Sequence, residues 1–199
     1  MTISLQKGQG ISLKKNDGTS LTKVFLGTGW DVANSSGGGF LGKLFGGAGG
    51  GDSIDLDASV IMFDANKQFV DNVYFGQLKS RDGSVVHSGD NLTGEGDGDD
   101  EVINVDLTRV PANVSSLVFT ISSFRGQTFK NVSNAFCRLV DATNNTEIAK
   151  YNLSQQGDYT ALIIAKIYRH NGEWKMKAIG ETCQGRTLDQ MKPTIINFI

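Results

Sequence analysis

The sequence predicts an all-β fold, an antiparallel β-sandwich with a few short helices, and three observations support that class. Apolar and polar residues alternate with a period of two along most of the chain, whereas helical periodicity is scarce. Glycine is abundant, with 25 residues, and proline is rare, with 2. This composition suits many tight turns, because glycine adopts positive φ and the backbone keeps its N–H donors.

The expected strands are short segments, mostly rich in β-branched and aromatic residues. In chain order they cover residues 23–28, 53–64, 101–107, 116–124, 135–141, 146–153, 160–169 and 174–179. Alternation within 53–64 gives one apolar side, consisting of Ile54, Leu56, Ala58, Val60 and Met62. The other side consists of Asp55, Asp57, Ser59, Ile61 and Phe63. That side begins charged and ends apolar, as expected for a strand that enters the core from a charged rim.

Turns and helices complete the expected elements. The last two strands are joined through "RHNGEW", where Asn171-Gly172 is the pair that a type I′ hairpin turn selects. A short helix is expected in residues 131–136, capped by Asn131 or Ser133. A helical turn is expected in residues 187–198, ended by Pro193.

The chain has 199 residues, and we interpret residues 1–199 as a single domain with a glycine-rich internal loop at 34–51. The N-terminal residues show no secretory pattern and the most apolar stretch, 161–168, is too short to span a membrane, so a cytoplasmic protein is expected.

Cys137 and Cys183 form no CxxC pair, and Cys137 is expected to be a small buried hydrophobe. The net charge of -2 and the lack of a basic run argue against a nucleic-acid partner.

The strongest chemical signal is "SGDNLTGEGDGDDE", residues 88–101, with six carboxylates and four glycines. Glu95, Asp97, Asp99 and Glu101 recur at every second position and would project to one side of an extended chain. Like charges this close favour a counterion, and glycine lets a backbone curl around one. Asp90 and Asn91, together with the acidic strand start "DLD", offer further oxygen ligands. The alternative is a solvated acidic loop.

The ligand types favour calcium. No His/Cys cluster has zinc spacing, and His87 and His170 are expected to be hydrogen-bonded residues at strand ends. An all-oxygen set favours Ca²⁺, with Mg²⁺ possible if waters are retained. The EF-hand pattern is not matched, so loops at a sheet edge are expected instead.

The glycine-rich segment offers a second signal. Gly37 to Lys43 fits the spacing of a phosphate-binding loop, but Leu44 stands where a hydroxyl is required, so nucleotide binding is disfavoured. Its apolar side chains could instead touch a membrane surface or a protein partner, or fold over the protein's own core. These side chains are Phe40, Leu41, Leu44 and Phe45.

Five motifs in this order resemble the TerD-like proteins of bacterial tellurite-resistance and stress-response operons. They are "VFLGTGWD", "DLDASVIMFD", "LKSRDGSVVHSGDNLTGEGDGDDE", "AFCRLVD" and "YRHNGEWKMKAIG". The resemblance runs from residue 4 to about residue 180, and the loop "GFLGKLFGG" is similar to that of the branch that includes TerZ and TerX. It implies a β-sandwich with calcium-binding loops at one end, holding more than one Ca²⁺, and a role in withstanding tellurite and other stresses.

The resemblance also implies a set of metal ligands. Its motifs fall on Asp31, Asp55, Asp57, Asp90, Asn91, Glu95, Asp97, Asp99, Asp100 and Glu101, with backbone carbonyls of Gly94, Gly96 or Gly98. Before "LKS", where the family often has asparagines, this chain has Gly76-Gln77. No catalytic motif is found, so the expected function is a non-enzymatic calcium-binding stress protein that acts with other proteins of the tellurite-resistance system. Two alternatives are a Mg²⁺- or Mn²⁺-dependent phosphoester or nucleotide-processing enzyme and a Ca²⁺-dependent module at the inner face of the membrane.

Overall fold

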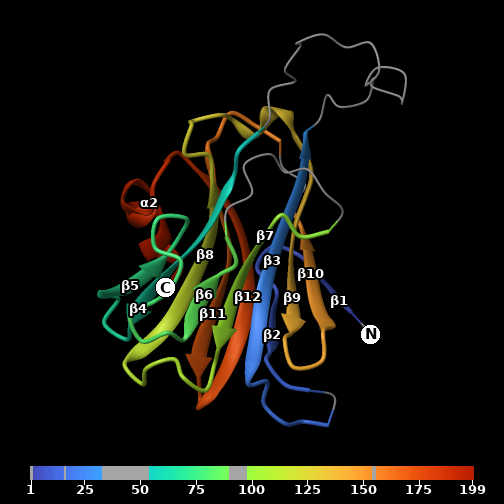
Figure 1. The fold of residues 1–199 in the computed structure, drawn as a ribbon, viewed down its shortest axis with the longest axis vertical. Coiled ribbons are helices and arrows are strands. Elements are labelled where there is room, and N and C mark those ends of the chain that lie inside the picture. The colour runs from blue at the N-terminus through green and yellow to red at the C-terminus, as the bar shows by residue number, and fades with distance from the viewer. Residues whose placement is uncertain (1, 16, 33–53, 90–97, 154–155) are drawn as a thin grey trace.

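The chain folds into two β-sheets that pack face to face (Figure 1). A computed structural model describes residues 2–15, 17–32, 54–89, 98–153 and 156–199, and within them each sheet has six strands. The first sheet has the order β1 (Ile3–Leu5), β10 (Thr146–Asn152), β9 (Val132–Asp141), β3 (Lys23–Val32), β7 (Glu101–Asp106) and β6 (Val85–His87). The second has the order β2 (Gly10–Ser12), β12 (Glu173–Cys183), β11 (Ala161–His170), β8 (Val114–Ser122), β4 (Asp57–Asp64) and β5 (Phe69–Val73). The all-β sandwich expected from the sequence is confirmed.

The pairing is antiparallel throughout the described strands except at one edge, where β1 runs parallel to β10. Each expected strand segment contributes to an observed strand. The sequence reading missed β1, β2, β5 and β6, which span only three to five residues. Strands this short carry too few alternating residues for a periodic signal.

The alternation in β4 has the predicted two sides. The apolar side of β4 and of the residues just before it packs in the main core between the sheets: Ile54, Leu56, Ala58, Val60 and Met62. Its other side is also buried, but Ile61 and Phe63 belong to a second, smaller apolar cluster on the outer surface of the second sheet. The apolar end of this side therefore enters a separate core.

Helix α2 (Leu188–Ile195) covers that second cluster and continues into a 3₁₀ turn, η2 (Ile196–Phe198). Thr187 caps the helix by accepting a hydrogen bond from the Gln190 backbone N–H. The expectation that Pro193 would end the helix is wrong, because the helix passes through it to Ile195. Burial of Leu188, Met191 and Ile195 outweighs the cost of one missing donor in a helix of two turns.

The hairpin expectation is confirmed, and the first helix expectation is wrong. Asn171 and Gly172 have φ of 52° and 78°, as a type I′ turn requires. In place of a helix at 131–136, a single 3₁₀ turn, η1 (Phe129–Asn131), leads directly into β9. Asn134 has a φ of 51° where the β3–β9 register shifts, so the polar residues that resemble a helix start form a bulge.

Three expectations remain, which concern Cys137, a membrane-spanning segment and the glycine-rich segment. Cys137 is fully buried, and burial raises the pKa of its thiol to about 12, so it behaves as the expected small hydrophobe. Among the described residues no helix is long and apolar enough to cross a membrane. The glycine-rich segment 34–51, with its four apolar side chains, lies outside the described residues.

Candidate functional site

Acidic residues from three strands gather at one end of the sandwich, the upper end in Figure 1. There β3 ends and β4 and β7 begin, and Thr28 of β3 pairs with Glu101 of β7. The described acidic members of the expected ligand set lie at this end: Asp31, Asp55, Asp57, Asp99, Asp100 and Glu101. Gly98 is described as well and lines the same pocket as Asp31 and Asp100. The remaining members lie outside the described residues: Asp90, Asn91, Gly94, Glu95, Gly96 and Asp97.

Asp31 and Asp100 line one polar pocket of about 690 Å³. Asp100 Oδ2 accepts a hydrogen bond from the Trp30 backbone N–H at 2.8 Å, and Asp31 Oδ2 accepts one from Asn134 Nδ2 at 2.8 Å. Burial raises the pKa of Asp100 above its ordinary range, and the negative charges of Asp31 and Asp99 raise it further against the hydrogen bond from Trp30. A cation at this pocket would relieve that repulsion.

Asp99 has a different arrangement, because both of its oxygens face one guanidinium group. Arg138 Nε and Nη2 lie 2.7 Å and 2.8 Å from Asp99 Oδ1 and Oδ2, and Arg138 Nη1 lies 3.3 Å from Glu147 Oε2. A Cβ at Gly27 would collide with the Asp99 carboxyl group, so this glycine makes room for the pair. The structure therefore gives Asp99 the role of joining β7 to β9.

Glu101 reaches across the sandwich and is almost completely buried. Its Oε2 accepts a hydrogen bond from the Ala58 backbone N–H at 2.5 Å and lies 3.3 Å from His87 Nε2. His87 Nε2 is also 3.2 Å from the Ala58 carbonyl oxygen, while His87 Nδ1 accepts from the Gly89 N–H at 3.1 Å. A proton on His87 Nε2 suits these contacts, because Nδ1 is the acceptor for the Gly89 N–H. His87 is a hydrogen-bonded strand-end residue, as expected from the sequence.

Asp55 and Asp57 lie on the second sheet and interact with the segment that follows β8. Asp57 Oδ2 accepts from the Phe124 backbone N–H at 3.2 Å, and Asp55 Oδ2 lies 3.1 Å from Arg125 Nε. Asp57 lines a pocket that does not include Asp31 or Asp100. The described carboxylates thus divide among two pockets, with Asp31 and Asp100 in one and Asp57 in the other, and three structural contacts, made by Asp55, Asp99 and Glu101.

These residues fit a hard cation by donor type, since each described candidate is a carboxylate and Asp31 and Asp100 face one pocket. They are too few, however, to complete a metal site. Among the described residues, no group of three or more His, Cys, Asp or Glu side chains is placed to hold a metal ion. A complete site would need oxygen donors from the acidic segment 90–97 as well. Sequence reasoning missed Arg138 and Gly27, whose only signals are a charge inside an apolar strand and a glycine inside another.

The chain is a β-sandwich with carboxylates gathered at one end, and comparison with known proteins gives its family. The TerD domain family model matches residues 1–192. The tellurium resistance protein TerZ of Serratia marcescens is 50% identical over 99% of this chain and 98% of its own length. The stress response protein SCP2 of Bacillus subtilis (strain 168) is 49% identical over 96% of this chain and 98% of its own. TerX of Serratia marcescens is 37% identical over 91% and 93%.

The solved structures agree on the fold. A Streptomyces coelicolor A3(2) homologue of the telluride resistance protein TerD superposes with a TM-score of 0.67 at 18% identity, covering 87% of this chain and 96% of its own. The chain belongs to the TerD family of tellurium-resistance and stress-response proteins.

Proposed function

We propose that the protein is a calcium-binding, non-enzymatic component of a bacterial tellurite-resistance and stress-response system. The observation that carries the proposal is the pocket shared by Asp31 and Asp100, where repulsion from Asp31 and Asp99 adds to burial in raising the pKa of Asp100. A divalent cation would neutralise the charge gathered there. Oxygen donors without nitrogen or sulfur match the preference of Ca²⁺.

Asp31 and Asp100 would hold the ion, together with donors from residues 90–97. Asp55 and Asp57 are candidates for a second ion on the other sheet, because they begin β4 at the same end. When bound, Ca²⁺ supplies positive charge that orders the surrounding oxygen donors. Asp99 and Glu101 already serve Arg138 and the Ala58 backbone, so we propose that they support the site without ligating the ion.

The proposed role is to present a surface to other proteins of the system in the cytoplasm, with the inner membrane face as a further location. Relatives at 50% and 49% identity are named as tellurium-resistance and stress-response proteins. Those names describe protection from stress and give no reaction, which supports a non-enzymatic role for this chain.

A calorimetric titration of chelator-stripped protein with Ca²⁺, repeated in the presence of Mg²⁺, tests the proposal. We expect Ca²⁺ binding that Mg²⁺ does not displace, and at least a tenfold loss of affinity in Asp31→Asn and in Asp100→Asn. Glu173→Gln is the matched control, because it removes one carboxylate charge at the β11–β12 hairpin, at the opposite end of the sheet. No Ca²⁺ heat, or a preference for Mg²⁺, would contradict the proposal.

A further inference from the structure

A second pocket, of about 400 Å³, lies on the outer surface of the second sheet next to the start of α2. We call it the aromatic pocket. Its lining comes from β4, the turn after β5, the end of β8 and the first residues of α2: Asp57, Ser59, Asn72, Tyr74, Phe75, Gly76, Ser122, Phe124, Arg186, Thr187, Leu188 and Asp189. It is separate from the pocket of Asp31 and Asp100. It shares Asp57 with the second ion proposed above, so a ligand of this pocket and that ion would compete for the same carboxylate.

Three aromatic rings form one wall. Phe75 packs edge-on against both Tyr74 and Phe124, with 5.4 Å between ring centroids in each pair. Phe75 and Phe124 are 37% and 51% exposed, which is unusual for adjacent large apolar side chains. Exposed apolar side chains that gather at a hollow mark a binding surface more often than scattered ones do.

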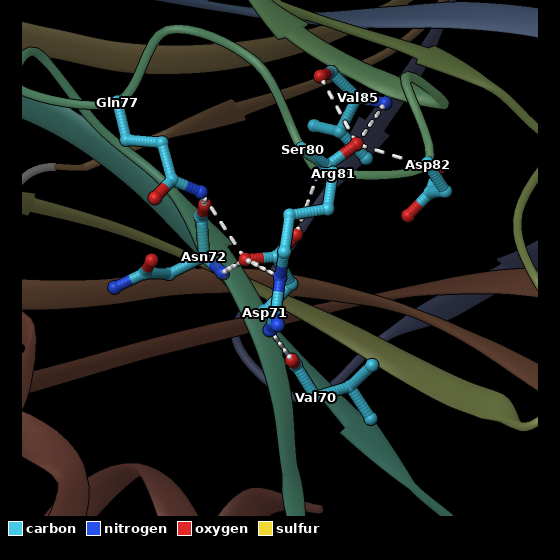
Figure 2. Close-up of polar contacts among 8 residues, drawn as sticks. All are labelled: Val70, Asp71, Asn72, Gln77, Ser80, Arg81, Asp82 and Val85. Carbon is cyan, nitrogen blue, oxygen red and sulfur yellow. Dashed lines mark hydrogen bonds and ion pairs between the residues drawn. The ribbon is translucent and has the colours of Figure 1, made fainter.

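Hydrogen bonds fix the turn that carries the Phe75 ring. Tyr74 and Gln77 close a two-residue turn, with backbone hydrogen bonds of 3.1 Å and 2.9 Å in the two directions. Gln77 Nε2 donates to Asp71 Oδ1 at 3.1 Å and to the Asn72 carbonyl oxygen at 2.7 Å, and Arg81 N donates to Asp71 Oδ2 at 2.8 Å (Figure 2). The Phe75 ring is therefore carried by a fixed turn, which lowers the entropy lost when a ligand packs against it.

The lining also contains three buried polar side chains. Ser59 and Ser122 offer hydroxyl groups, and Asp57, which is 6% exposed, offers a carboxylate whose Oδ2 accepts from the Phe124 N–H. An ionised carboxylate has about four acceptor positions, so it can serve a ligand together with its protein partners. At the edge, Asp189 is paired with Lys192 at 2.6 Å, and the Arg186 guanidinium packs over Gly126.

We infer that the aromatic pocket receives an arginine side chain from a segment of a partner protein. A guanidinium group is planar, stacks on aromatic faces and donates two parallel hydrogen bonds to a carboxylate. The pocket combines such rings with the buried Asp57 carboxylate and hydroxyl acceptors. An ammonium group satisfies the charge of Asp57 but not the stacking, so arginine is favoured over lysine.

Arg186 completes the charge pattern at the edge of the pocket. Its guanidinium lines the pocket, so it opposes the binding of any cation, and the attraction of Asp57 must exceed that repulsion for the first arginine. A second cation would meet the repulsion without that compensation, whereas a carboxylate would be attracted. The partner segment is therefore expected to carry one arginine with an acidic neighbour rather than a run of basic residues.

The test is a titration of the full-length protein with N-acetyl-arginine-amide in the presence of a chelator, followed through the ring resonances of Phe75 and Phe124. We expect saturable shifts at these rings and binding of N-acetyl-lysine-amide that is weaker by at least threefold. Shifts that do not saturate, or equal binding of the two probes, would overturn the inference.

Variants assign the binding to this pocket. Asp57→Asn should weaken binding about tenfold or more, as expected for the loss of a charge-assisted hydrogen bond. Phe124→Leu keeps apolar bulk but removes a ring face, and should weaken it about threefold. Phe69→Leu is the matched control, because Phe69 is an exposed phenylalanine of β5 that lies near a lysine outside the pocket.

The same variants separate this inference from the calcium proposal. Asp100→Asn should leave arginine binding unchanged, whatever it does to calcium. If Asp57→Asn fails to fold, the double variant Phe75→Leu, Phe124→Leu decides the matter on exposed residues alone. Wild-type affinity in that double variant would overturn the inference.

Discussion

Glu101 is a buried carboxylate that satisfies a backbone group of β4 at a point where β4 has no pairing with β5. The β4–β5 ladder begins at Val60, so the Ala58 N–H and C=O lie beyond the end of β5. Glu101 from β7 accepts from that N–H, and His87 from β6 lies within hydrogen-bond distance of that carbonyl oxygen. Two side chains of the first sheet thus satisfy a backbone unit of the second, which otherwise would carry a desolvation cost.

We predict that Glu101→Gln lowers the free energy of unfolding by about 1.5–3 kcal/mol, the usual range for a buried hydrogen bond to a charged group. The glutamine can keep its carbonyl oxygen facing the Ala58 N–H and His87 Nε2, so the loss comes from the missing charge. Urea denaturation measures the loss, and Glu173→Gln, which removes only a surface ion pair with Lys14 at the start of β12, should change stability by less than about 1 kcal/mol.

The measurement should be made with a chelator and again with Ca²⁺. A loss of similar size in both conditions identifies Glu101 as a structural contact between the sheets. A loss that appears only with Ca²⁺ would show instead that Glu101 is a metal ligand.

At this scale the sequence distinguishes residue types but not their partners. The alternation of Glu95, Asp97, Asp99 and Glu101 indicates one shared role, yet Asp99 faces Arg138 and Glu101 faces the Ala58 backbone. Those partners are 39 and 43 positions away, and only the sheet registers bring them together. A local pattern holds no information about such registers.

Asp71 gives the protein an acid-sensitive contact outside the acidic end. Burial alone would raise the pKa of its carboxyl group, but hydrogen bonds from the Arg81 and Asn72 backbones and the Gln77 amide lower it below the usual range (Figure 2). A folded-state pKa below the unfolded value of about 3.9 stabilises the folded protein above that pH. The contribution is lost as the pH falls through the folded-state pKa.

We therefore predict that Asp71→Asn lowers stability by about 2 kcal/mol at neutral pH, because the charge-assisted hydrogen bonds are lost. The difference between the variant and the wild type should begin to shrink below the unfolded-state pKa of about 3.9, and it should be lost as the pH falls through the lower folded-state pKa of Asp71. Urea denaturation between pH 3 and pH 7 measures this difference. A gap that stayed constant with pH would mean that the ionised form of Asp71 contributes nothing.

Among the elements, the β11–β12 hairpin was the most predictable from sequence. Its signal is entirely local, because Asn171 and Gly172 adopt the positive φ of the turn while His170 pairs with Glu173. In the elements that were mispredicted, tertiary contacts override the local signal. Residues 131–136 resemble a capped helix, but pairing with β3 makes them a bulged strand.

The hairpin gives the prediction at this scale. Gly172→Ala should destabilise the protein by about 1–2 kcal/mol, the cost of a left-handed conformation for a residue with a Cβ. That cost would be conformational only, because no heavy atom lies within 4 Å of the added Cβ. Asn171→Gly is the control and should be close to neutral, since glycine accepts the same φ. Thermal unfolding compares the two, and equal melting temperatures would contradict this account.

At the scale of the molecule, the two sheets enclose one large core and α2 encloses a second. The fold class was predictable, because apolar and polar residues that alternate with a period of two indicate which side of each strand is buried. The second core was not, because Ile61 and Phe63 continue a side of β4 that begins with the polar residues Asp55, Asp57 and Ser59. The alternation alone does not show whether the outer surface of a sheet is covered by a helix or exposed to solvent.

A cation bound at the acidic end should stabilise the folded protein, although Asp31 and Asp100 both belong to the first-sheet side of the sandwich. Carboxylates of β3, β4 and β7 meet at this end, and an ion that binds only the folded state adds RT ln(1 + [L]/Kd) to its stability. We predict that Ca²⁺ at a hundredfold excess over Kd stabilises the protein by about 2.7 kcal/mol, which corresponds to a rise in melting temperature of roughly 5–11 °C. Removal by chelator should reverse it.

The charge of the site determines how variants should respond. Asp31→Asn and Asp100→Asn each remove part of the repulsion in the free protein, so their melting temperatures in chelator should equal or exceed that of the wild type. Their response to Ca²⁺ should be smaller, because the same carboxylates attract the ion. Calorimetric scans with chelator and with saturating Ca²⁺ separate the two effects. A full calcium response in the double variant Asp31→Asn, Asp100→Asn would place the ion elsewhere, whereas destabilisation of both variants in chelator alone would mean that these carboxylates are structural.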